Sequence, residues 1–152
     1  MIFYSAKNVY NKVMQYKKMG NTFVVRIDKG EEIVKNLTRL AKREKINAGH
    51  ILAIGTVLDP TLRFFDPRKK KYSTKTFRGH YEIINLTGNF SVMNGAPYLH
   101  IHITLGDKNF HAFGGHLLKA QVGGAFEAVV EKLPRRVGRK FSQNIGLNLF
   151  EF

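Results

Sequence analysis

The sequence predicts one α+β domain in which a single main helix packs on a largely antiparallel β-sheet. Three observations predict this class. Residues 31–45 repeat apolar side chains at helical spacing, whereas most other segments are short apolar or alternating runs typical of strands. A third is length, because 152 residues suit one domain with a sizeable core of its own.

The N-terminal part begins with polar and aromatic residues that show no clear period. We expect residues 1–13 to be an extension and residues 14–152 to form the domain, with a first strand at residues 22–28. The helix follows, with Glu31 and Glu32 in its first turn, where the helix dipole favours carboxylates.

The remaining strands are expected between turn signals. Asn47 and Gly49 should stop the helix, and Asp59-Pro60, Asp66-Pro67, Thr87-Gly88 and Gly123-Gly124 should separate strands. The β-compatible segments are residues 50–58, 62–65, 72–77, 80–86, 88–93, 117–122 and 125–133.

The chain is strongly basic, with 25 Lys and Arg against 11 Asp and Glu and a net charge of +14. Such an excess indicates an anionic partner such as DNA, although a solvated positive surface is the alternative. The candidate nucleic-acid-binding residues are Arg68, Lys69, Lys70, Lys71, Arg135 and Arg136.

Composition also excludes several classes. The chain has no cysteine, so disulfide scaffolds and thiolate chemistry are excluded, and we expect a cytoplasmic protein. It has no apolar run of signal-peptide or membrane-spanning length, so we expect no membrane partner. The sequence contains no P-loop, nucleophile elbow or His-Glu-x-x-His motif.

Four of the six histidines lie within residues 95–116. Residues 98–105 alternate as a strand, which places His100 and His102 on one face. If residues 107–109 form a three-residue loop with Asn109 in the left-handed conformation, His100 opposes His116 and all three histidines share that face. A two-residue loop would bring His111 onto that face instead; we favour His116 and keep His111 as the reserve.

Three neutral imidazoles with an open fourth position suit zinc, and nickel, copper or iron could also occupy such a site. The alternative is that these are ordinary hydrogen-bonding histidines on a half-exposed sheet face.

Several motifs in order resemble the plants and prokaryotes conserved (PPC) domain, also described as a PD1-like DNA-binding motif, in its prokaryotic type without an AT-hook. The resemblance covers about residues 19–133. Its motifs are Asp28-Lys29-Gly30-Glu31, Leu62-Arg63-Phe64-Phe65-Asp66, Gly79-His80-Tyr81-Glu82, Leu86-Thr87-Gly88-Asn89, Leu99-His100-Ile101-His102 and Gly114-Gly115-His116-Leu117.

The resemblance implies a homotrimer of compact domains, with zinc bound by His100, His102 and His116. Plant relatives join this domain to an AT-hook that binds DNA. Residues 135–140 lack the Arg-Gly-Arg-Pro core of that motif, so minor-groove binding is not carried over.

These features lead to a ranked expectation of function. The leading one is a non-enzymatic, zinc-binding, trimeric module associated with DNA. The alternatives are a metal-dependent enzyme that uses a zinc-bound water and a small-ligand-binding module. For the enzyme, Glu82 and Glu127 are the candidate acid-base residues, and a carboxylate could also join the metal site.

Overall fold

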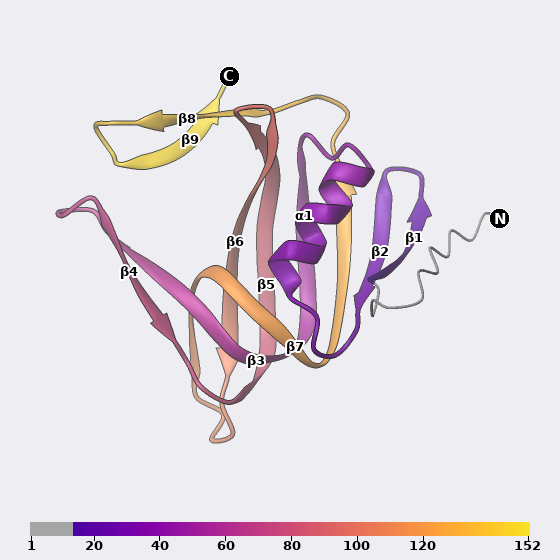
Figure 1. The fold of residues 1–152 in the computed structure, drawn as a ribbon, viewed down its shortest axis with the longest axis vertical. Coiled ribbons are helices and arrows are strands. Elements are labelled where there is room, and N and C mark those ends of the chain that lie inside the picture. The colour runs from indigo at the N-terminus through magenta and orange to yellow at the C-terminus, as the bar shows by residue number, and fades with distance from the viewer. Residues whose placement is uncertain (1–13) are drawn as a thin grey trace.

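The structure, a computed structural model, describes residues 14–152 (Figure 1). Its described elements are β1 (Gln15–Met19), β2 (Thr22–Ile27), α1 (Ile33–Arg43), β3 (Gly49–Asp66), β4 (Lys71–Thr76), β5 (His80–Met93), β6 (Ala96–Gly106), β7 (Ala112–Lys132), β8 (Gly138–Ser142) and β9 (Leu147–Glu151). The predicted α+β class with one main helix is confirmed. The predicted extension, residues 1–13, lies outside the described residues.

The strands form a sheet that closes on itself. β3 pairs with β5 and β7, and β6 pairs with the same two strands, so the four make a continuous circuit of antiparallel pairings. The hairpin of β1 and β2 extends the sheet beyond β7, and β4 pairs with β3. The hairpin of β8 and β9 joins β5 through one parallel pairing, Val92 with Gly138.

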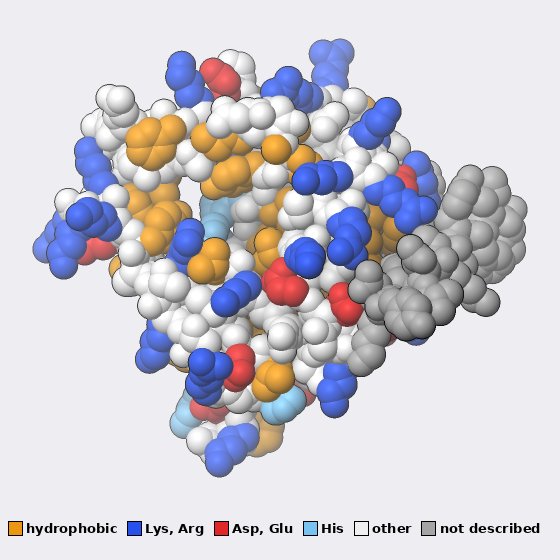
Figure 2. Space-filling view, in the orientation of Figure 1, with side chains coloured by type: hydrophobic (Ala, Val, Ile, Leu, Met, Phe, Trp, Pro, Cys, Tyr) orange, Lys and Arg blue, Asp and Glu red, His pale blue; other side chains and the backbone are white. Residues whose placement is uncertain are grey.

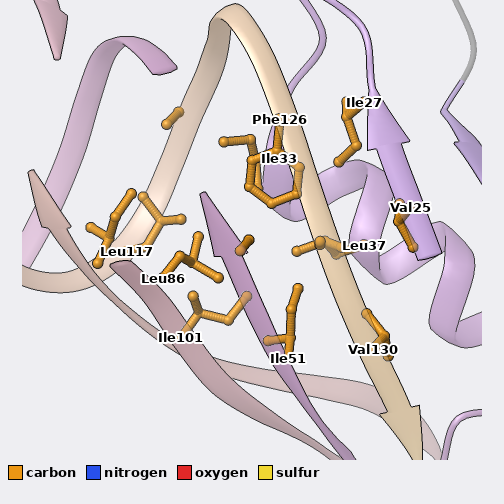
Figure 3. Close-up of a cluster of buried hydrophobic side chains, with 14 of the residues drawn as sticks. Val25, Ile27, Ile33, Leu37, Ile51, Leu86, Ile101, Leu117, Phe126 and Val130 are labelled. Atoms are coloured by element: carbon orange, nitrogen blue, oxygen red, sulfur yellow. The ribbon is translucent and has the colours of Figure 1, made fainter. Parts of the chain in front are cut away.

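The core lies between α1 and the inner face of this sheet. Ile33, Leu37 and Leu40 recur at helical spacing on α1 and are fully buried. They pack in one cluster with inward-facing strand residues (Figure 3), among them Val25, Ile27, Ile51, Leu86, Ile101, Leu117, Phe126 and Val130. Burial of this apolar surface is the main term that holds the helix on the sheet.

The helix starts and ends differently from the prediction. Glu32 precedes the first turn as the N-cap, and its carboxylate accepts hydrogen bonds from the backbone N–H of Val34 and of Lys35. The backbone N–H groups of the first turn have no partner within the helix, so the Glu32 carboxylate stabilises the helix although Glu32 itself precedes it. At the other end, the helix stops at Arg43, and Lys45 takes a left-handed conformation with φ 52°. The helix therefore ends before the predicted stop at Asn47.

The long strands run through three breaks predicted from turn signals. β3 continues across Asp59-Pro60, where the register with β7 shifts and Asp59 has φ 48°. β5 continues across Thr87-Gly88, and β7 continues across Gly123-Gly124. At Asp59-Pro60 and at Gly123-Gly124 the pairing of β3 with β7 is irregular, and a bulge bends a strand without necessarily ending it. At Thr87-Gly88 the pairing with β3 and β6 is regular. The described part of the chain holds no helix long and apolar enough to span a membrane.

Candidate metal centre

Three histidines converge on the outer face of β6 and β7. His100 and His102 lie on β6 and His116 on β7, and one nitrogen of each lies within 4.8 Å of the others. The Nε2 atoms of His100 and His102 are 3.2 Å apart. The intervening Ile101 and the following Ile103 are buried in the core, since alternate residues of a strand face opposite sides. The structure therefore brings together the three side chains that the sequence selected.

The register of this hairpin differs from the prediction by two residues. His102, not His100, lies directly opposite His116, and Gly106 lies opposite Ala112. A shift of two residues keeps every side chain on its face, because the side-chain period of a strand is two. The predicted face is correct for this reason, although the predicted pairing is wrong.

The difference arises in the loop, which has five residues, 107–111, instead of three. The Asp107 carboxylate accepts hydrogen bonds from the backbone N–H of Asn109 (2.8 Å) and of His111 (2.9 Å), which fixes the wider turn. Phe110 takes the left-handed conformation, φ 65°, where Asn109 was expected. His111 is exposed beside Asp107, with 3.5 Å between its Nδ1 and the carboxylate, and it is not part of the histidine cluster.

The surroundings favour neutral imidazoles. Burial, with the neighbouring His100, His102 and Arg63, lowers the pKa of His116 from 6.5 to about 4. Burial also lowers the pKa of His100, with further contributions from His102 and Arg139. Neutral imidazole is the form that binds a metal ion, so these side chains are ready to ligate near neutral pH.

A cation and an aromatic ring border His116. Arg63 on β3 is its cross-strand partner, and the Arg63 guanidinium lies 5.6 Å from the ring centre of Tyr72, which is itself 5.8 Å from the His116 ring. Among the described residues, Arg63 Nε and His116 Nδ1 are buried without a hydrogen-bond partner. Buried polar atoms are nearly always paired in native proteins, so these two atoms of cross-strand neighbours are candidates for contact with water or a ligand.

A second arginine lies on the other side of the cluster. Arg139 on β8 is only 8% exposed and donates hydrogen bonds to Ser91 Oγ (2.7 Å), the Asn148 carbonyl (2.6 Å) and Asn89 Oδ1 (2.7 Å). Asn89 is the direct cross-strand partner of His100. Burial lowers the pKa of the Arg139 guanidinium. These contacts connect the C-terminal hairpin to the histidines.

A cavity of about 240 Å³ opens beside His100, between the hairpin of β3 and β4 and the hairpin of β8 and β9. Figure 2 shows histidine surface within a hollow bordered by hydrophobic side chains, where the hairpin of β3 and β4 faces the hairpin of β8 and β9. The lining residues are Tyr72, Asn89, Tyr98, His100, Arg139, Leu147, Asn148, Leu149 and Phe150. Of the three histidines, His100 lines this small, largely apolar cavity.

The two carboxylates considered as acid-base residues lie elsewhere. Glu82 on β5 is opposite Gly106, four residues along β6 from His102. Glu127 on β7 borders a different cavity, on the sheet face beside Ile54. Neither lines the cavity at the histidines.

The basic residues form two separate groups. Arg68, Lys69 and Lys70 are exposed in the turn between β3 and β4, and Lys71 begins β4. Arg135 and Arg136 are exposed in the connection between β7 and β8. The two groups lie on opposite sides of the view in Figure 1, so the structure does not bring them together.

Sequence reasoning did not find the two arginines beside the cluster. Arg63 alternates with the buried Leu62 on β3, and that alternation could have placed it on the histidine face. Arg139 gave no such signal, because the single pairing of Val92 with Gly138 brings its hairpin to β5 from a distant part of the chain.

Comparison with known proteins gives the family context. A family model, the Plants and Prokaryotes Conserved (PCC) domain, matches residues 14–134. A crystal structure of a candidate DNA-binding protein from Bacteroides thetaiotaomicron is 46% identical, with a TM-score of 0.89 over 92% of this chain and 98% of that one.

Two other solved structures and one curated sequence are also similar. A metal-containing protein from Archaeoglobus fulgidus is 34% identical, with a TM-score of 0.82 over 93% of this chain and all of that one. A plant- and prokaryote-conserved protein from Pyrococcus horikoshii is 31% identical, with a TM-score of 0.80 over 95% and 98%. The bifunctional protein GlmU of a Synechococcus strain is 28% identical over 96 residues, which span 62% of this chain but 14% of that protein.

Proposed function

Because the chain belongs to the Plants and Prokaryotes Conserved domain family, as its motifs predicted, we propose that it is a zinc-binding, homotrimeric module that associates with DNA. In this proposal His100, His102 and His116 hold the metal ion. The similar metal-containing protein from Archaeoglobus fulgidus supports a metal at this fold, and the candidate DNA-binding protein from Bacteroides thetaiotaomicron supports the DNA association.

The convergence of three imidazoles is the observation that carries the proposal. Two nitrogens bound tetrahedrally to zinc at about 2.0–2.1 Å are separated by about 3.3 Å. The 3.2 Å between the Nε2 atoms of His100 and His102 matches that spacing. His116 supplies a third nitrogen within reach and carries a buried nitrogen with no partner among the described residues. These side chains therefore fit a three-histidine zinc site.

Zinc held by three protein ligands would keep a fourth position for water or a ligand and would lower the pKa of bound water to about 7. Use of that water as a nucleophile also needs a base within hydrogen-bond reach. Among the described residues that line the adjoining cavity there is no carboxylate. The arrangement supports a binding or regulatory role above a hydrolytic one.

Homotrimer formation is supported by the sheet face opposite α1. Val24, Val129 and Leu52 form a continuous exposed row across β2, β7 and β3, and Ile54 lies beside it. The exposed fractions of these four side chains run from 42% to 59%. An apolar patch of this kind is typical of a subunit interface.

DNA association is supported by the net charge of +14 and by the exposed cations from Arg68 to Lys71. Arg135 and Arg136 would form a second contact. Cationic side chains at a hairpin tip can bind phosphates without reading base sequence.

The zinc site is tested by metal analysis of the untagged full chain grown with zinc. We expect near-stoichiometric zinc in the wild type, and little in His100→Ala, His102→Ala and His116→Ala at matched oligomeric state. His111→Ala is the control, because His111 lies in the same hairpin but outside the cluster. A wild type without metal, or a His111→Ala variant that loses as much metal as His116→Ala, would refute the site.

A further inference from the structure

The charge balance around the candidate metal centre is strongly positive. Arg139 is 8% exposed, and it donates three hydrogen bonds, to a hydroxyl, a carbonyl and an amide oxygen. Within residues 14–152, it takes part in no ion pair, and the cavity that it lines with His100 contains no carboxylate. A buried cation is normally compensated by an anion, because neutral acceptors replace only part of its lost hydration.

Arg63 adds a second cation next to His116. It too has no ion-pair partner among the described residues, and its buried Nε donates no hydrogen bond. The two guanidinium groups therefore border the histidine cluster from two different strands, β3 and β8. A divalent ion in that cluster would raise the local charge further.

We propose that the fourth position of this centre takes the carboxylate of a small organic acid, which Arg139 positions through a charge-assisted hydrogen bond. The inference rests on the proposed metal site and assigns its ligand class. Arg139 retains donors for this purpose, since Nη1 and Nη2 each carry two hydrogens and each donates one hydrogen bond to the described residues. Guanidinium groups bind carboxylates well because their donor geometry matches the two oxygens.

The cavity also defines the rest of the ligand. Its volume of about 240 Å³ suits a small molecule, and Tyr98, Leu147 and Leu149 give its wall an apolar character. The Tyr98 ring is held in place because Arg139 stacks 4.8 Å from its centre and Asn148 donates a hydrogen bond to its hydroxyl. An acid with a compact apolar body fits such a chamber better than inorganic phosphate does.

The test uses the full chain loaded with cobalt(II), whose visible absorption changes when a ligand binds the metal. We expect benzoate to change the spectrum and to bind at least tenfold more tightly than benzyl alcohol or inorganic phosphate. Equal affinity for benzoate and benzyl alcohol would overturn the carboxylate assignment. Tighter binding of inorganic phosphate than of benzoate would overturn the inference that the ligand has an apolar body.

Variants identify the role of the arginine. Arg139→Met should weaken benzoate binding at least tenfold while keeping its metal, whereas Arg136→Met, which removes an exposed cation outside the cavity, should bind as the wild type does. Arg63→Met is a second test, in case the loss of Arg139 unfolds the C-terminal hairpin. It should weaken benzoate binding as well. Metal content is measured on every sample. A wild-type chain that loads no metal refutes the proposed metal site. Metal-loaded variants that bind benzoate as tightly as the wild type, for both Arg139→Met and Arg63→Met, refute only this inference.

Discussion

His102 of β6 lies directly opposite His116 of β7, and their ring centres are 5.5 Å apart. This relationship depends on close approach of the two strands just beyond the pair, where Gly114 lies opposite Thr104. A methyl group at Gly114 would collide with the backbone carbonyl of Ile103. The geometry of the histidine cluster is therefore tied to a position that has no room for a side chain.

Gly114→Ala should consequently damage both stability and the site. We expect the free energy of unfolding to fall by about 1–3 kcal/mol, since overpacking forces the backbone to move, and zinc affinity to fall at least tenfold. Chemical denaturation and zinc titration measure the two effects. Gly138→Ala is the control, because a methyl group there meets no atom closer than 3.7 Å. Wild-type zinc affinity in Gly114→Ala would show that strand spacing does not set the site.

The sequence was sufficient to predict the histidine face but not its pairing. Alternation alone places His100 and His102 together, and any hairpin of the correct parity adds His116. The loop length depends on the Asp107 carboxylate binding two backbone N–H groups, and several turns are compatible with the same residues. Arg139 could not be predicted at the site, because its position follows from long-range packing of the C-terminal hairpin and from no local pattern.

The hydroxyl of Tyr16 on β1 should make the stability of the fold vary with pH in the alkaline range. It donates a 2.5 Å hydrogen bond to the Glu44 carboxylate at the end of α1. Burial and this bond raise its pKa from 10.0 to about 12. The folded chain therefore keeps a proton that the unfolded chain loses, so this stabilisation is complete below pH 10 and is lost as the pH rises toward 12.

Tyr16→Phe should thus be less stable than the wild type at pH 8, and its stability should decline less steeply between pH 10 and 12. Urea denaturation at a series of pH values measures both slopes. The ultraviolet absorbance of the folded chain follows the ionisation of its tyrosines directly. In Tyr16→Phe, the part of this titration that occurs near pH 12 should be missing. Parallel stability curves for the two proteins above pH 10 would contradict the assignment.

The apolar sheet face makes a prediction about assembly. Leu52→Lys places a charge within the exposed row of Val24, Val129 and Leu52, so it should dissociate the proposed trimer while leaving each folded subunit intact. Light scattering after gel filtration measures the mass. Phe141→Lys is the matched control, because Phe141 is as exposed as Leu52 but lies on the C-terminal hairpin. A trimer that survives Leu52→Lys, or a monomeric wild type, would exclude this face as the interface.

The basic turn between β3 and β4 predicts how DNA binding responds to salt. Each phosphate contact contributes about 0.9 to the slope of log affinity against log salt concentration. Arg68→Gln with Lys71→Gln should therefore lower that slope by up to about 1.8, because two contacts are lost. Fluorescence anisotropy with a labelled duplex at several salt concentrations gives the slopes. Lys35→Gln with Lys42→Gln removes the same charge from the exposed surface of α1. If both double variants lower the slope equally, net charge and not the hairpin tip governs DNA binding.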